Sequence, residues 1–224
     1  ATRVDSAANN WSVYVLDFAG LQLGALEELA SVGSVLGESD VDRVIRLITW
    51  LAEEIQLRVS AQSARGATSF EGLNDLLGHQ RLPRILLMVD GFDSFYGFLD
   101  AQHRQGEYVG MFRRICQEGR AAGVHVVLTS TRSNEGDGPT RSAMSTHLVM
   151  SGPPALLMDH GVKADVLPED PPPGRCTIDK KHQLQLAVPA DVEAIRLRIA
   201  EDQPPMESDL DNAAAPPLIV TAED

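Results

Sequence analysis

The run Arg84-Ile-Leu-Leu-Met-Val-Asp90 holds five consecutive apolar residues, ends on a carboxylate and is followed by Gly91. A continuous apolar run of this length is typical of a strand buried on both faces of a parallel sheet. Two further runs, Trp11–Asp17 and Val124–Thr129, are also mostly apolar and end on a polar residue. Apolar residues recur at helical spacing from Val41 to about Ser63. This alternation predicts an α/β fold with an open, mostly parallel sheet and helices on both faces.

The other elements are shorter. Helices are predicted over Leu21–Ala30, Ser69–Leu77, Phe92–Asp100, Tyr108–Ala122 and Pro154–His160, and strands over Val32–Leu36, His147–Met150, Arg175–Ile178 and Gln183–Val188. The last two strands follow a proline-rich bend at 168–174 and are expected to form a small antiparallel C-terminal element. Residues 130–139 are predicted as a loop.

The chain divides into three predicted parts. Residues 1–190 form one α/β domain, a length that buries a single sizeable core. Residues 191–202 form a C-terminal helix that Asp191 caps, with Ile195 and Ile199 on one face. Residues 203–224 are rich in proline, alanine and acids, a composition typical of a tail or linker.

The net charge of −13 argues against DNA as a partner. Seven acidic residues and no basic ones lie in 201–224, so residues 1–200 still carry −6. Proteins that grip the DNA backbone usually present a basic stripe, because counterion release drives binding. The sequence has no such stripe, and we expect no DNA contact.

Composition also bears on membranes and metals. No run approaches the roughly 18 apolar residues that a membrane span requires, so we expect no direct membrane contact from this segment. Cys116 and Cys176 are too few for a disulfide scaffold or a thiolate zinc site, and both are expected to be buried, inert thiols.

Polar side chains follow three of the predicted strands. Ligands of open parallel sheets bind at the carboxyl ends of the strands, where Asp17, Asp90 and the segment Thr129–Arg132 are expected to meet. A carboxylate in the position of Asp90 suits Mg²⁺, which prefers hard oxygen ligands and bridges nucleotide phosphates. We therefore predict Asp90 as the Mg²⁺ position and Asp17 as a supporting residue; the alternative is a structural aspartate at a strand end.

In nucleotide-hydrolysing motors a second acid commonly follows such an aspartate and polarises the attacking water. Gly91 holds that position and has no side chain for the task. Asp93 is a candidate substitute for catalysis. Its alternative role is a first-turn acid that stabilises the amino end of the helix starting at Phe92.

Several segments resemble one known family. Ile85 to Asp90 resembles a Walker B motif, and Gly123 to Arg132 resembles the segment after Walker B in FtsK/SpoIIIE proteins. Tyr14-Val-Leu-Asp-Phe-Ala-Gly20 and Ser31-Val-Gly-Ser-Val35 are similar to the EccC/EssC ATPase domains of type VII secretion. The stretches 161–165, 172–175 and 184–187 resemble the end of those domains. The likeness covers roughly residues 11–190.

This resemblance implies a RecA-like fold that uses ATP and Mg²⁺. It implies that Thr131 senses the γ-phosphate, where relatives often carry Gln or Asn, and that Arg132 accompanies it; a surface ion pair is the alternative for Arg132. It also implies a cytoplasmic module of a membrane-anchored secretion complex. Its partners would be other ATPase modules of a hexamer-type ring and small helical secreted substrates.

The sequence departs from the family in one respect. No Gly-x-x-x-x-Gly-Lys-Ser/Thr motif occurs, and the only lysines are Lys163, Lys180 and Lys181, all after Asp90. Such a loop holds the phosphates with its amides and its lysine. We expect the loop and its preceding strand, placed by the resemblance beside the Walker B strand, to lie before Ala1 or in another chain. This chain alone is expected to bind Mg-ATP weakly or not at all and to be inactive.

Three functions therefore stay open. The chain is an ATP-binding motor module of a type VII secretion ATPase, incomplete or degenerate as it stands. Alternatively, it is a catalytically inactive docking or regulatory module that binds the C-terminal tails of secretion substrates, which the glycine at position 91 favours. The third alternative, an FtsK-type DNA translocase domain, is disfavoured by the acidic charge.

Overall fold

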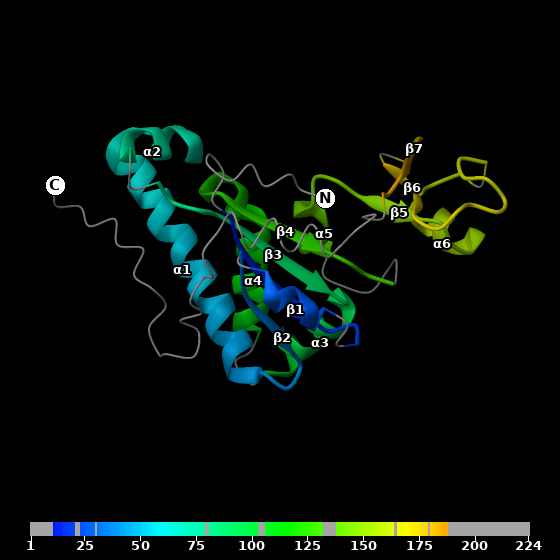
Figure 1. The fold of residues 1–224 in the computed structure, drawn as a ribbon, viewed down its shortest axis with the longest axis horizontal. Coiled ribbons are helices and arrows are strands. Elements are labelled where there is room, and N and C mark those ends of the chain that lie inside the picture. The colour runs from blue at the N-terminus through cyan, green and yellow to red at the C-terminus, as the bar shows by residue number, and fades with distance from the viewer. Residues whose placement is uncertain are drawn as a thin grey trace.

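A four-stranded parallel sheet forms the centre of the molecule (Figure 1). The computed structural model describes residues 11–20, 23–29, 31–78, 81–102, 106–131, 138–163, 165–178 and 180–187. The strands lie in the order β2-β1-β3-β4, with bounds β1 (Trp11–Asp17), β2 (Val32–Gly37), β3 (Arg84–Asp90) and β4 (Val124–Leu128). The parallel α/β sheet predicted from the sequence is confirmed.

Helices follow the strands along the chain. They are the 3₁₀ turn η1 (Gly24–Glu28), α1 (Val41–Arg65), α2 (Phe70–Leu77), α3 (Phe92–Ala101), α4 (Glu107–Glu118), the 3₁₀ turn η2 (Gly119–Ala122), α5 (Gly138–Ala143) and α6 (Pro154–Asp159). None of them is long and apolar enough to cross a membrane.

The structure corrects three of the predicted elements. Within the predicted helix Leu21–Ala30, the described part holds the short 3₁₀ turn Gly24–Glu28 with no buried residue instead of an amphipathic helix. The helix predicted over Tyr108–Ala122 tightens into a 3₁₀ turn at Gly119, where the chain turns back toward β4. Residues 130–139 are not all loop, since α5 begins at Gly138. The helix predicted at 191–202 and the tail lie outside the described residues.

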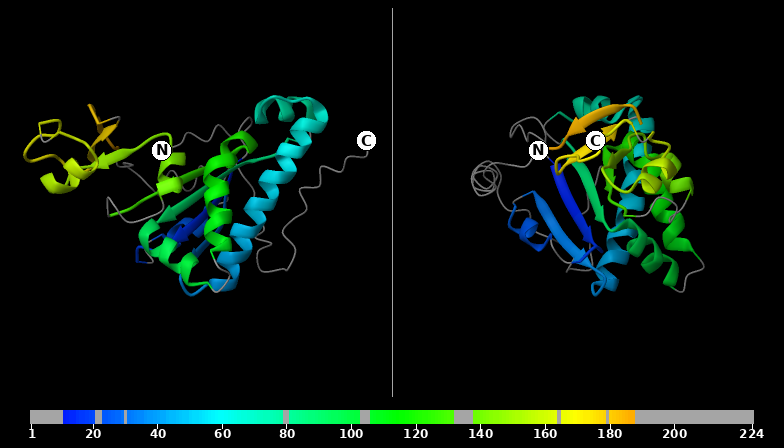
Figure 2. Two further views of the ribbon diagram at one scale, coloured as in Figure 1. Left: turned by 180° about the vertical axis from the view of Figure 1, so that it is seen from behind. Right: turned by 90° about the vertical axis from the view of Figure 1, so that its right-hand side faces the viewer.

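The main core lies between the sheet and helices α1, α3 and α4, which cover one face of it (Figure 2). Strand side chains alternate between the two faces, so Tyr14, Leu16 and Leu87 point into this core. On the other face, Leu86 and Met88 are only half-buried. Aromatic rings fill the α3 side, where Phe95 packs edge-on against Phe18 and Phe112, at centroid distances of 5.2 and 5.0 Å.

The neighbours of β3 differ from the expectation. β1 pairs with β3 through seven consecutive residues, from Trp11 opposite Arg84 to Asp17 opposite Asp90, and β4 pairs with its other side. The strand before a phosphate loop cannot lie directly beside β3, because both edges of β3 are taken. Among the described strands, the open edge of the sheet on this side belongs to β4.

A second, smaller sheet comes from the C-terminal part, as predicted. It is antiparallel, in the order β5 (Leu148–Met150), β6 (Arg175–Ile178), β7 (His182–Gln185). One face packs under the α6 region in a cluster of Val149, Leu157, Val162 and Leu167. The other face carries exposed apolar side chains, Leu148, Met150 and Leu184. Cys176 here and Cys116 on α4 are both buried, as expected.

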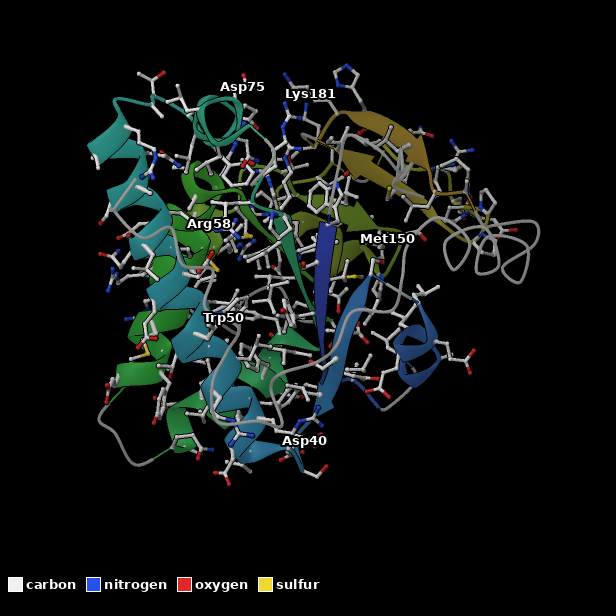
Figure 3. The ribbon with its side chains drawn as sticks, turned by 60° about the vertical axis from the view of Figure 1, so that its left-hand side comes forward. Asp40, Trp50, Arg58, Asp75, Met150 and Lys181 are labelled. Carbon is white, nitrogen blue, oxygen red and sulfur yellow. The ribbon has the colours of Figure 1, made fainter. Side chains whose placement is uncertain are left out.

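A buried arginine joins α1 to the amino ends of two strands. Arg58 is 2 % exposed, and its Nε donates to Glu54 Oε1 at 2.5 Å. Its Nη1 donates to the carbonyl oxygens of Pro83, just before β3, and Ala122, just before β4, at 2.9 and 3.1 Å. Figure 3 shows Arg58 on α1. Burial lowers the pKa of Arg58, and the adjacent Glu54 opposes that shift.

Arg58→Met should lower the free energy of unfolding by about 3–5 kcal/mol, because it leaves the Glu54 carboxylate buried without its cation. The double variant Glu54→Leu/Arg58→Met should lose less, since it removes both charges. Urea denaturation followed by circular dichroism measures both. Equal losses in the single and double variants would show that the ion pair is not what Arg58 contributes.

His125 on β4 should titrate below its usual range. Its ring lies 5.4 Å from that of Trp11; burial, and then the charges of Arg84 and Arg120, lower its pKa from the ordinary 6.5. Because the folded pKa is the lower one, this group stabilises the fold above about pH 6.5, and that stability is lost as the pH falls through the folded pKa. NMR titration should show a pKa below 6.5 that rises in Arg120→Gln; an unchanged pKa would contradict the charge effect.

Candidate functional site

The carboxyl ends of β1, β3 and β4 bring together most of the predicted site. Asp17 and Asp90 are directly opposite each other in the β1–β3 register. Asp17 is 2 % exposed, and its Oδ2 accepts a hydrogen bond from the Leu23 amide at 2.8 Å. Asp17 therefore fixes the chain that leaves β1, while Asp90 is only partly buried and stands at the edge. Asp17 lies at the same edge as Asp90, and its supporting role at the site stays a prediction.

Thr129, the residue after β4, forms hydrogen bonds along the turn between β3 and α3. Its amide donates to the Val89 carbonyl at 2.9 Å, and its own carbonyl accepts from the Phe92 amide at 2.8 Å. Its hydroxyl donates to Asp90 Oδ1 at 2.5 Å and accepts from the Gly91 amide at 3.0 Å. One residue thus bonds to four consecutive residues of the turn and fixes one oxygen of the Asp90 carboxylate.

Asp93 lies in the first turn of α3 and faces the same strand end. Its Oδ2 accepts a hydrogen bond from the Ser130 hydroxyl at 2.8 Å. Its Oδ1 is buried with no hydrogen-bond partner among the described residues. The N-cap residue of α3 is Gly91, which has no side chain to cap the helix. The side chain of Asp93 therefore points toward the end of β4 and does not cap its own helix.

Gly91 is held in a conformation that only glycine adopts easily, with φ at 77°. A β-carbon there would lie 2.8 Å from the Ala19 amide nitrogen and from the Phe18 carbonyl carbon. These atoms are backbone and cannot swing aside. The Phe18 amide also donates to the Asp90 carbonyl at 2.8 Å, which keeps the chain after β1 against this turn. An acid in place of Gly91 does not fit this arrangement.

The two residues predicted to sense phosphate differ from these. Thr131 is exposed, and no hydrogen bond joins it to Asp90, Asp93 or any other described side chain. Arg132 lies outside the described residues. Thr129 makes the contact with Asp90 instead. The position of Thr129 at the end of the apolar run is the signal in the sequence that indicates it. The family pattern instead indicates Thr131, two residues further on.

The donor set at this edge fits a hard divalent cation. Asp90 Oδ2 has no hydrogen bond to the described part of the chain, and Asp93 Oδ1 is also unpartnered. Carboxylate oxygens are the ligands that Mg²⁺ prefers. Two of the lysines that could bind phosphates lie away from this edge. Lys180 and Lys181 are in the β6–β7 turn. Figure 3 shows Lys181 at the opposite end of the molecule from Asp40, which follows β2 at the carboxyl edge.

The parallel α/β sheet, with Asp90 at its carboxyl edge and helices packed alongside, has the RecA-like fold. The FtsK/SpoIIIE family profile matches residues 4–135, more than half of the sequence. The chain belongs to the FtsK/SpoIIIE family.

Known relatives place it near one branch of that family. It is 26% identical over 204 residues to the ESX-1 secretion system protein EccCb1 of Mycobacterium tuberculosis, covering 84% of this chain and 33% of that protein. It is 30% identical over 177 residues to the ESX secretion system protein EccC of Thermomonospora curvata, covering 76% of this chain and 13% of that protein. The chain therefore spans a third or less of these relatives.

A solved structure agrees on the fold. ATPases 2 and 3 of Thermomonospora curvata EccC, solved in complex with a signal sequence peptide, superpose with a TM-score of 0.67 at 24% identity. The match covers 87% of this chain and 36% of that one. The predicted RecA-like fold and the similarity to type VII secretion ATPases are confirmed.

Gly91→Ala should lower the free energy of unfolding by about 1–3 kcal/mol, since it combines a positive φ with a backbone clash. Gly97, in the interior of α3, is the matched control, because a β-carbon there meets nothing within 4 Å. Gly97→Ala should raise stability by about 0.5–1 kcal/mol through helix propensity. Thermal and urea unfolding measure both. A neutral Gly91→Ala would mean that the turn tolerates a side chain and that an acid could be placed there.

Proposed function

We propose that this chain is a nucleotide-dependent module of a type VII secretion ATPase. Asp90 takes the Mg²⁺ position, with Asp17 as its structural neighbour on β1. The observation that carries the proposal is the edge itself, where Asp90 is fixed by Thr129 through one oxygen and keeps the other unbonded. The similarity to EccC proteins of secretion systems supports the secretion setting.

The phosphate contacts would come from beyond these 224 residues. The sequence has no phosphate-loop motif, and its first lysine is Lys163. The free edge of β4 ends at Leu128, and Thr129 directly after it bonds to Asp90. A strand pairing with that edge would deliver the loop after it to the carboxyl edge that carries Asp90. We propose that an upstream segment or a neighbouring module of the same ring supplies it, on the cytoplasmic side of a membrane-anchored complex.

The second candidate function is a docking or regulatory module that does not hydrolyse ATP, and Gly91 favours it. The position next to Asp90 cannot carry an acid, because backbone atoms of Phe18 and Ala19 occupy the space. Hydrolysis would then depend on Asp93, whose carboxylate Ser130 holds at the same edge. Thermomonospora curvata EccC has been solved with a signal sequence peptide. By analogy, this module would bind the C-terminal tails of small helical secreted substrates.

DNA translocation is the third candidate and has the least support. The chain carries −13, and its positive charges do not gather along one stripe of the sequence. DNA-binding surfaces release counterions through clustered basic side chains. Salt-dependent retention on duplex DNA would be needed to revive this function.

Titration of this chain with Mg-ATP by calorimetry should give no binding tighter than about the millimolar range, because amides and a lysine that hold phosphates are missing. A protein extended upstream should bind more tightly and lose that binding in Asp90→Ala. Micromolar binding by the 224-residue chain, abolished by Asp90→Ala, would mean that another segment of this chain cradles the phosphates. Tight binding by the extended protein that Asp90→Ala leaves intact would contradict the role of Asp90.

A further inference from the structure

The end of β4 presents two consecutive hydroxyl residues to two different carboxylates. Thr129 donates to Asp90 at 2.5 Å, and Ser130 donates to Asp93 at 2.8 Å. Neither hydroxyl is buried, so water could serve either carboxylate equally well. The need to satisfy buried polar groups therefore does not explain why Thr129 bonds to Asp90 and Ser130 to Asp93.

Thr129 is set apart from its neighbours by how firmly it is held. Its amide, carbonyl and hydroxyl all bond to residues 89–92, whereas Thr131, two positions on, makes no hydrogen bond to the described residues of the turn. The Gly91 amide donates to the Thr129 hydroxyl oxygen, and this leaves the hydroxyl proton directed to Asp90. A donor whose orientation is imposed by the backbone gives its acceptor a fixed orientation too.

A fixed carboxylate is what a metal site needs from its surroundings. Groups that hydrogen-bond to a ligand carboxylate orient it, and their loss typically lowers metal affinity by about 10–100-fold. Asp90 has one oxygen bonded to Thr129 and one unbonded to the described chain. This arrangement suits a carboxylate that binds a metal ion through one oxygen while its other oxygen is held in place.

We infer that Thr129 is the positioning residue of the Asp90 metal site, holding Oδ1 so that Oδ2 is presented to a divalent cation. This inference rests on the proposed role of Asp90 and adds a residue that the sequence pattern did not single out. Thr129 acts through Asp90 and touches no metal. Ser130 has the corresponding relation to Asp93.

The test follows the binding of Mn²⁺ alone to the ¹⁵N-labelled chain. Bound Mn²⁺ broadens nearby amide signals, so the Mn²⁺ concentration that broadens Asp90 and Gly91 measures even weak affinity. Thr129→Val keeps the shape of the side chain and removes the hydroxyl, and it should require about 10–100 times more Mn²⁺. Thr129→Ser should stay within about threefold of the wild type, because it retains the donor.

Three controls accompany it. Thr131→Val, the matched change two residues away, should leave the Mn²⁺ concentration needed for broadening unchanged. Thr129→Ala provides a second removal of the hydroxyl should the valine variant fail to fold, and the remaining amide signals report folding in each case. Asp90→Asn should abolish the local broadening.

The outcomes separate the two claims. If Asp90→Asn abolishes broadening and both hydroxyl-free variants bind Mn²⁺ like the wild type, Thr129 has no positioning role, while Asp90 remains a metal ligand. If Asp90→Asn leaves the wild-type broadening unchanged, or no local broadening occurs, the metal role of Asp90 fails and the inference fails with it. Weakening by Thr131→Val to the same degree as by Thr129→Val would also overturn it.

Discussion

The seven-residue register between β1 and β3 is the constraint on which the site depends. It places Asp17 opposite Asp90 and aligns Tyr14 and Leu16 of β1 with Leu87 and Val89 of β3 on the face that packs against the helices. A slip by one residue would move all of these side chains to the other face, since strand side chains alternate. The core of α1, α3 and α4 against one face therefore fixes the register. The register in turn brings the two aspartates to one edge.

The two ends of the sheet are held by different chemistry. At the amino ends, the buried guanidinium of Arg58 ties α1 to the carbonyls before β3 and β4. At the carboxyl ends, the exposed hydroxyl of Thr129 and the close approach of Phe18 to Gly91 fix the turn after β3. A buried ion pair suits a permanent joint, because breaking it is costly. Exposed hydroxyls suit an edge that has to stay open to a ligand.

This arrangement changes the meaning of the glycine after Asp90. From the family pattern alone, Gly91 stands at a position where an acid is expected. In the structure it is the residue that lets the chain after β1 close over the turn, so that Phe18 packs against Phe95. The two descriptions are compatible, and together they explain why a simple exchange of Gly91 would not restore the family pattern. Any second carboxylate has to come from elsewhere, and Asp93 is the one that the fold places at the edge.

The sequence by itself determined the strands, the long helix and the aspartate edge, because apolar runs and helical spacing are local signals and carboxyl ends of parallel strands share an edge. It also determined that no phosphate-loop motif is present. Only the tertiary structure decided that β4 occupies the second side of β3, that Thr129 contacts Asp90 where Thr131 was expected to act, and that Gly91 has no room for a side chain. Each of these depends on atoms brought together from strands far apart in the chain, and no local pattern in the sequence records such distances.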